Sequence, residues 1–152
     1  AISENIENLP DDLGMALLQC AQAFTKASGS SYGTLLATGL MAMAKSVKGN
    51  AQIPASQVAE LVGLARDQMQ ARGKAELGGK TVLDSLDAVA KAVNGAANPA
   101  DAAAKAVDDA LVQFKDEKAT IGRARIFAEK SVGLDDPGML AMTKIVQALA
   151  GR

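Results

Sequence analysis

Hydrophobic residues recur every three or four positions through most of the chain, which is the spacing of one face of an α-helix. Glycine, asparagine or proline interrupts the pattern repeatedly. We therefore predict six helices, over residues 11–26, 34–48, 54–72, 81–94, 98–120 and 136–150. No stretch alternates between apolar and polar residues as a competing strand would. Because most connections are short, neighbouring helices should run antiparallel in an all-α bundle.

Each predicted helix has one apolar stripe that should face the core. The stripe residues are Leu13, Leu17, Ala21 and Phe24, then Leu36, Leu40, Met43 and Val47, then Val58, Leu61, Ala65 and Met69, then Val82, Leu86, Val89 and Val93, then Val107, Leu111 and Phe114, and finally Met139, Met142, Val146 and Leu149. Methionines at this spacing are expected to fill the core, since their flexible side chains fit irregular gaps.

Two helix starts carry an especially clear signal. Asn98 precedes Pro99, and Asp136 precedes Pro137. Asparagine and aspartate cap helix N-termini, and proline is tolerated at the first helical position because its missing N–H would be unpaired there anyway. We therefore expect the fifth and sixth helices to begin at these two pairs.

Composition and charge limit the functions that remain open. A chain of 152 residues is expected to form one domain over 1–152, large enough to bury a core. Aromatic residues make up 3% of the chain and the formal net charge is -1, so neither nucleic acid nor an anionic membrane is an expected partner. No apolar run approaches the ~20 residues of a membrane span, and no signal peptide is visible. We therefore expect a cytoplasmic protein.

The chain contains no histidine. This excludes a Ser-His-Asp triad, a Cys-His pair and a histidine-ligated metal within it. Cys20 is the sole cysteine, so no internal disulfide can form. It lies in a helical pattern among alanine and leucine, where we expect a buried structural thiol.

Three loops contain residues suited to binding an anion. The first runs from Ser28 to Thr34, where free N–H groups at the next helix start and small side chains allow close approach. An ordinary capped turn is the alternative interpretation. The third loop, from Gly122 to Gly138, contains Arg123 and Arg125, either of which can make two parallel hydrogen bonds to phosphate. Its alternative is a surface loop with exposed charges.

The second loop, from Gly73 to Thr81, invites comparison with a phosphate-binding P-loop. That motif needs four residues between its first glycine and the Gly-Lys-Thr, whereas five separate Gly73 from Gly79 here. No strand is predicted before the loop either. We therefore reject the P-loop. Two interpretations of this loop are left: its glycines and lysines contact a phosphate, or it is an ordinary solvated loop.

Taken together and in order, the three loops resemble those of the DhaL-type domain, the nucleotide-binding subunit of dihydroxyacetone kinase. The residues that carry the resemblance are Ala27-Ser28-Gly29, Tyr32-Gly33-Thr34, Arg72-Gly73-Lys74-Ala75-Glu76, Gly78, Lys80-Thr81, Gly122-Arg123-Ala124, Ser131-Val132-Gly133 and Asp135-Asp136-Pro137-Gly138. They span the chain from about Pro10 to its end.

This resemblance implies a barrel of antiparallel α-helices that holds ADP or ATP with Mg²⁺ at one end. The residues that would line the nucleotide site are Ala27, Ser28, Gly29, Gly73, Val82, Arg123, Asp136, Pro137 and Gly138. The first three would approach the phosphates, and the next two would lie by the base, with Val82 in place of a common methionine. The last four would complete the site.

The function implied by the resemblance is phosphoryl transfer from the nucleotide to dihydroxyacetone or a related ketose. In the family the sugar is bound to a histidine of a separate subunit or domain, so no catalytic residue is expected in this chain. The substrate-binding subunit is the expected partner, a phosphocarrier subunit of the phosphotransferase system is a further candidate, and homodimerisation is left open. The alternative is a non-catalytic homologue that acts as a regulatory or protein-interaction module.

One departure from the family concerns the metal. The family places a Gly-Asp-x-Asp-x-Gly type loop, whose aspartates hold Mg²⁺, before the region that matches Pro10. This chain begins at Ala1, about where the helix after that loop would be. We therefore expect either a fragment of a longer subunit or a divergent homologue, with no metal ligands of its own. Because phosphoryl transfer depends on such metals, we do not expect the chain alone to be a competent kinase.

Overall fold

The computed structural model describes residues 7–121 and 123–152, and within them every regular element is a helix. This confirms the all-α fold class. The chain forms two compact units, residues 1–74 and 75–152, and the single domain expected over 1–152 stays a prediction. Among the described residues, no helix has both the length and the apolar character that crossing a membrane requires.

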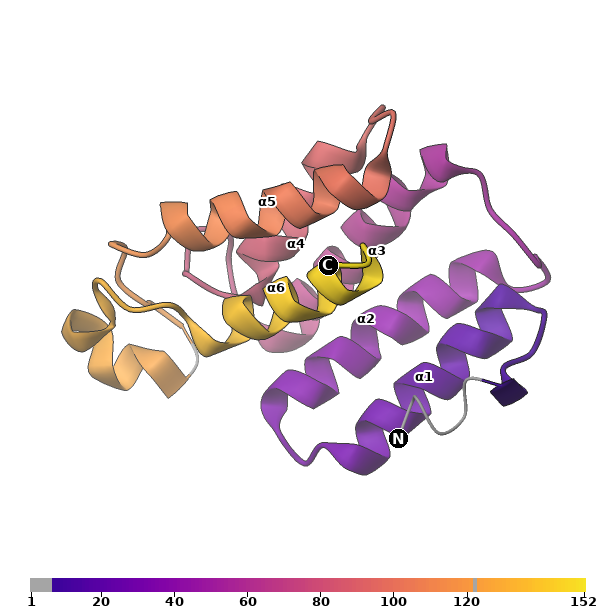
Figure 1. The fold of residues 1–152 in the computed structure, drawn as a ribbon. Helices are drawn as coiled ribbons and strands as arrows, with labels where there is room; N and C mark the ends of the chain where they lie inside the picture. The colour runs from indigo at the N-terminus through magenta and orange to yellow at the C-terminus, as the bar shows by residue number, and fades with distance from the viewer. Residues whose placement is uncertain (1–6, 122) are drawn as a thin grey trace. The chain divides into compact units, whose positions relative to one another are not determined.

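In the first unit, α2 (Ser31–Val47) is the central helix. It packs against α1 (Leu13–Ala27) and against α3 (Val58–Gly73), and Figure 1 shows α1 and α2 side by side. A single 3₁₀ turn, η2 (Ala55–Gln57), leads directly into α3. The predicted helices therefore exist, with boundaries shifted by a few residues at most.

Small residues allow the helices of the first unit to approach closely. Gly14 of α1 is buried where a Cβ atom would lie 2.6 Å from the carbonyl oxygen of Ala44 and from the Cα of Lys48. The start of α1 therefore lies against the end of α2, and the two helices run antiparallel. Gly39 of α2 approaches Met69 of α3 in a similar way, with 3.0 Å between a Cβ position and the sulfur.

Asp12 joins the start of α1 to the turn that follows α2. Its Oδ1 accepts the N–H of Met15 at 2.9 Å, and its Oδ2 accepts the N–H of Gly49 at 2.8 Å. The N–H of Leu13 donates to the carbonyl of Asn50 at 2.7 Å. The Met15 hydrogen bond is the main reason that the pKa of Asp12 is lowered from its ordinary value.

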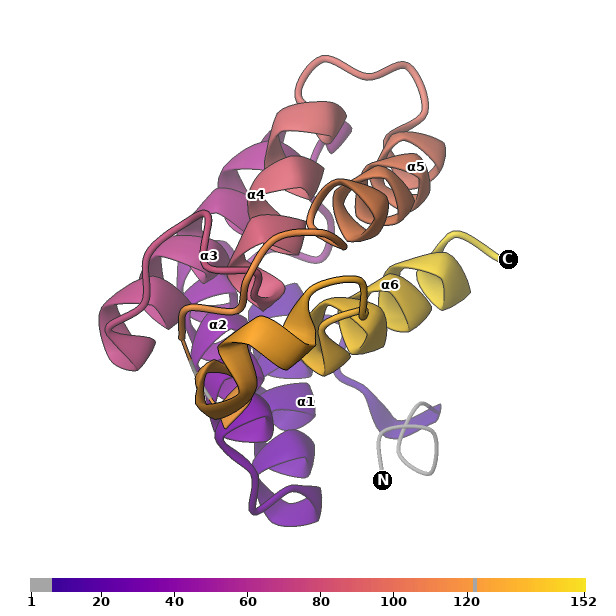
Figure 2. The same cartoon turned by 90° about the vertical axis from the view of Figure 1, so that its left-hand side faces the viewer.

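The second unit is built from α4 (Val82–Val93), α5 (Pro99–Gln113) and α6 (Pro137–Leu149), each of which packs against the other two. Figure 2 shows these three helices with η3 (Arg123–Ser131), the 3₁₀ segment that precedes α6. Asn98 and Asp136 cap α5 and α6, as predicted.

The chain between α5 and α6 differs most from the prediction. α5 ends at Gln113 rather than near residue 120, and the long loop contains η3, which is kinked at Phe127. Leu149 was expected to face the core but is 82% exposed, because α6 ends at this residue. Cys20 is half-buried rather than fully buried, and burial still raises the pKa of its thiol.

Candidate functional site

The turn between α1 and α2 carries three of the predicted site residues. Ala27 is the last residue of α1, and the N–H of Ser28 donates to the carbonyl of Phe24 at 2.9 Å. The hydroxyls of Ser28 and Ser30 are 2.7 Å apart, and the Ser30 hydroxyl accepts the N–H of Gly33 at 3.1 Å. Ser30 is therefore the N-cap of α2, and the turn has the capped geometry that the sequence offered as an alternative to an anion site.

Gly29 is the residue of this turn with the most free space. No heavy atom lies within 4 Å of the position that a Cβ would take there, and its φ is not in the left-handed region. The fold therefore does not require glycine at position 29. Gly33 is different, because a Cβ there would lie 2.3 Å from the Ser28 hydroxyl oxygen. A ligand that approaches the N-terminus of α2 would meet an open backbone at Gly29.

Gly73 ends α3 in the first unit. A Cβ at this position would be in ordinary contact with the methyl groups of Leu35, 3.4 and 3.7 Å away. The next residue, Lys74, has a φ of 49° and forms the left-handed C-cap of the helix. Gly73 is exposed, so a flat group could lie over its backbone without displacing a side chain.

In the second unit, Lys80 is buried and bonded in a way that the sequence did not predict. Its side chain is among the largest of those that are fully buried, with 1% of its surface exposed. The ammonium donates to the backbone carbonyls of Lys115, Glu117 and Ser131 at 2.8, 3.0 and 2.7 Å. An ammonium has three N–H donors. Solvation is therefore wrong for Lys80, and contact with a phosphate would require one of these carbonyl partners to be given up.

Asp84 closes the loop that contains Lys80. Its two carboxylate oxygens accept the N–H groups of Gly78 and Thr81 at 2.5 and 2.7 Å. Thr81 is the N-cap of α4 and forms a capping box with Asp84. Val82 begins α4 and is 5% exposed, so its side chain belongs to the core as the stripe predicted.

Asp136 begins α6 and lies within electrostatic reach of Lys80 and Asp84. Its Oδ2 accepts the N–H of Met139 at 2.9 Å. Burial is the main reason that the pKa of Asp136 is raised above its ordinary value of 3.8, and the nearby charge of Asp84 adds to the rise. Hydrogen bonds from Met139 and Gly138 and the charge of Lys80 lower the pKa, but by less. Asp136, Pro137 and Gly138 are therefore held together at one helix N-terminus.

Two residues of the third predicted loop, Gly122 and Arg123, fall wholly or partly outside the described structure. Gly122 lies outside the described residues. Arg123 is the first residue of η3, and its side chain also lies outside the described part of the chain. Among the described residues, no group of three or more His, Cys, Asp or Glu side chains is placed to hold a metal ion.

The main feature near the candidate site that the sequence did not predict is the Lys80 network. A local signal for Asp84 existed, because Thr81-x-x-Asp84 is the spacing of a capping box. No local signal marks the burial of Lys80, since its three acceptors lie 35, 37 and 51 residues away along the chain.

The fold and the positions of these loops define the structural class of the protein. The described chain is all-helical, and its candidate binding residues lie in turns at helix ends, at the N-termini of α2 and α6 and beside the C-terminus of α3. Helix N-termini of this kind are suited to anionic ligands. The class is therefore an all-helical protein whose candidate anion-binding residues lie in loops at helix ends.

Comparison with known proteins identifies the family. The DAK2 domain profile matches residues 1–151. The ADP-binding subunit DhaL of PEP-dependent dihydroxyacetone kinase 1 from Listeria innocua is 29% identical over 143 residues, which cover 94% of this chain and 70% of that protein. The chain belongs to the DAK2 domain family and is a DhaL-type domain, as the sequence resemblance indicated.

Other relatives are longer proteins. L-erythrulose 1-kinase from Mycolicibacterium smegmatis is 31% identical over 138 residues, which cover 88% of this chain and 24% of that protein. Triokinase/FMN cyclase from Rattus norvegicus is 33% identical over 128 residues, covering 80% of this chain and 22% of that protein. The chain therefore spans about a quarter of the length of these two kinases.

Proposed function

We propose that this chain is the nucleotide-binding component of a kinase that phosphorylates dihydroxyacetone or a related ketose. The observation that carries the proposal is its similarity, over 94% of its length, to a protein named as the ADP-binding subunit of a dihydroxyacetone kinase. Two further relatives are named as kinases of erythrulose, a ketose. The sugar would be bound by a partner subunit or domain, because this chain has no histidine to form the family's covalent adduct.

The loops support binding of a nucleotide through backbone groups. The N-terminus of α2 has a positive dipole end, and Gly29 beside it leaves the backbone open to a phosphate. Gly73 offers an exposed backbone to a planar base. Pro137 and Gly138 lie at a second helix N-terminus, held in place by Asp136. Ala27, Ser28, Val82 and Arg123 are further candidates through the family resemblance alone.

Magnesium would supply the positive charge that neutralises the phosphates in such a reaction. The described residues contain no cluster of ligands for it. The role proposed for this chain's own residues is to bind and orient the nucleotide.

The proposal is tested by calorimetric titration of the full natural protein with Mg-ADP. Gly29→Ala should weaken binding about tenfold, or ~1.4 kcal/mol, because the methyl group would occupy the open space beside the helix N-terminus. Gly63→Ala is the matched control, since Gly63 also has no neighbour within 4 Å of a Cβ but lies inside α3. Equal affinities of the two variants would refute the assignment of Gly29.

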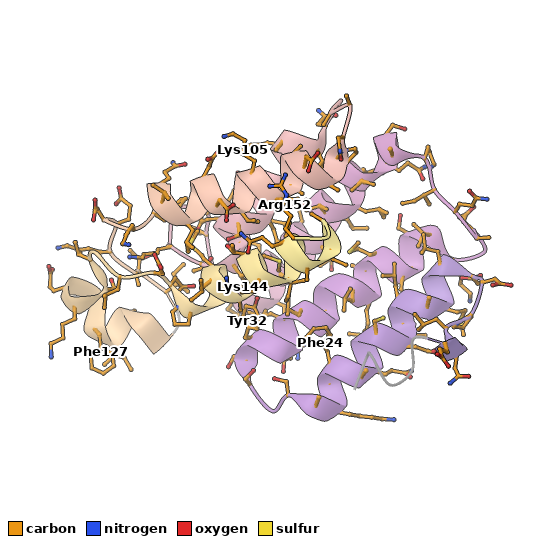
Figure 3. The ribbon with its side chains drawn as sticks, viewed as in Figure 1. Phe24, Tyr32, Lys105, Phe127, Lys144 and Arg152 are labelled. Carbon is orange, nitrogen blue, oxygen red and sulfur yellow. The ribbon has the colours of Figure 1, made fainter. Side chains whose placement is uncertain are left out.

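One observation favours the alternative of a protein-interaction module. Four large apolar side chains of the segment 126–134 are exposed: Ile126 (74%), Phe127 (59%), Val132 (41%) and Leu134 (61%). Figure 3 shows Phe127 on η3, away from the labelled residues of α5 and α6. Apolar residues exposed together on one segment are suited to a protein partner. This alternative predicts association with a kinase subunit that persists without nucleotide.

A further inference from the structure

The Lys80 side chain connects three parts of the second unit. Lys80 lies just before α4. Two of its carbonyl acceptors, in Lys115 and Glu117, follow α5, and the third, in Ser131, is at the end of η3. Its backbone φ of 58° is in the left-handed region, which is uncommon for a residue with a side chain. The chain therefore adopts a costly local conformation at the residue that makes these three contacts.

A buried ammonium is unfavourable unless its hydrogen bonds are made inside the protein. For Lys80 all three N–H donors have a carbonyl acceptor within 3.0 Å. Removal of the ammonium would leave three carbonyls without this donor. The geometry therefore makes the positions of residues 115, 117 and 131 depend on Lys80.

Other bonds extend the same network toward α6. The Ser131 hydroxyl accepts the N–H of Ala119 at 2.9 Å and donates to the carbonyl of Ala128 at 2.5 Å. The N–H of Gly133 donates to the carbonyl of Lys115, the same oxygen that Lys80 contacts. Three residues further on, Asp136 begins α6 within reach of the Lys80 charge. The lysine thus joins residues 115, 117 and 131 of the connection between α5 and α6, and these residues take part in the further bonds at 119, 128 and 133.

We propose that Lys80 is a positioning residue, which holds residues 115–121 and 131–136 in the conformation that binds the nucleotide without contacting the nucleotide itself. This inference rests on the proposed function, because residues 131–136 end at Asp136, one of the residues expected to contact the nucleotide. Direct contact between Lys80 and a phosphate would require one of its three carbonyl partners to be given up.

The test combines hydrogen exchange with calorimetric titration of the full natural protein with Mg-ADP. Lys80→Met retains most of the side-chain volume and removes the ammonium. The hydrogen-bonded amides of Glu117, Ala119, Thr120 and Gly133 should exchange at least tenfold faster, while those of α1 to α3 are unchanged. Affinity for Mg-ADP should fall at least tenfold. Lys91→Met is the matched control, because Lys91 lies on α4 with 75% of its side chain exposed and should change neither reading.

Three results would separate the possibilities. If Lys80→Met opens the segment but binds Mg-ADP with the wild-type affinity, the positioning role is wrong. If exchange in the segment does not change, the lysine does not hold it and the inference is equally wrong. If the wild-type protein itself does not bind Mg-ADP, the proposed function fails, and with it the nucleotide part of this inference.

A second variant decides the matter if Lys80→Met does not fold. Ser131→Ala removes two hydrogen bonds from the same network and leaves the lysine in place. It should accelerate exchange at Ala119 and Gly133 and weaken Mg-ADP binding about threefold. Faster exchange with unchanged affinity would overturn the positioning role.

Discussion

Replacement of Gly14 by alanine should destabilise the first unit, although alanine is the better helix former. The Cβ added at this position would lie 2.6 Å from the carbonyl oxygen of Ala44, 2.6 Å from the Cα of Lys48 and 2.9 Å from its nitrogen. All three are backbone atoms, so no side-chain rotation can relieve the clash. The start of α1 must move away from the end of α2.

The change in the free energy of unfolding follows from one stabilising and two destabilising effects. The helix propensity of alanine over glycine contributes about 1 kcal/mol in favour of the variant. Overpacking against a backbone typically costs about 1–3 kcal/mol. Movement of α1 also lengthens the Leu13–Asn50 and Asp12–Gly49 hydrogen bonds, now 2.7 and 2.8 Å, each of which contributes about 1 kcal/mol. We expect a net loss of about 2–4 kcal/mol, or a fall in Tm of roughly 4–16 °C.

Urea denaturation followed by circular dichroism measures this loss. Gly63→Ala is the control of the same chemistry, because Gly63 lies inside α3 with no atom within 4 Å of a Cβ. That variant should be more stable than the wild type, by about 0.5–1 kcal/mol. The two substitutions should therefore have opposite signs. A Gly14→Ala protein as stable as Gly63→Ala would refute the close approach of α1 to α2.

Three further predictions concern the second unit. Asp84→Ala should lower the free energy of unfolding by about 2–3 kcal/mol, because it removes the charged acceptor of the part-buried hydrogen bonds from the N–H groups of Gly78 and Thr81. A loss below about 0.5 kcal/mol in urea titration would contradict this. Burial raises the pKa of Asp136, so the folded state binds the carboxyl proton more tightly than the unfolded state does. This tighter proton binding stabilises the fold at low pH, and the stabilisation is lost as the pH rises from the ordinary pKa of 3.8 through the raised pKa. Asp136→Asn keeps an N-cap oxygen and lacks this loss, so its stability relative to wild type should increase between pH 3 and pH 7 in urea titrations; a decrease would refute the sign. Phe127→Ser should change the free energy of unfolding by less than about 0.5 kcal/mol, since 59% of the side chain is exposed, yet weaken association with a purified substrate-binding kinase subunit in a titration; unchanged association would count against an interface at η3.

The sequence was sufficient wherever the signal is local. Asn98 and Asp136 were expected to cap helices because each precedes a proline, and both do so. Apolar residues at helical spacing, such as Met69 and Met139, were expected in the core and are buried there. Such features depend on residues a few positions apart, so the chain near each one contains the information.

The sequence was insufficient where the cause lies far along the chain. From the sequence alone, Gly14 is only a residue of low helix propensity. Its role becomes clear in the structure, where the backbones of Ala44 and Lys48 lie against it. Lys80 reads as a solvated or phosphate-binding lysine until its distant carbonyls surround it. Charged residues give no periodic signal when they are buried, and this explains why the structure changes the interpretation of the second loop more than that of the other two.

The central claim, that the chain binds a nucleotide, is tested most directly by calorimetric titration of the full natural protein with Mg-ADP and, separately, with AMP. The account predicts saturable binding of Mg-ADP with one nucleotide per chain, and weaker binding of AMP by at least tenfold, because the loops at helix N-termini are expected to hold the terminal phosphates. No heat of binding with Mg-ADP, or equal affinities for the two nucleotides, would contradict it.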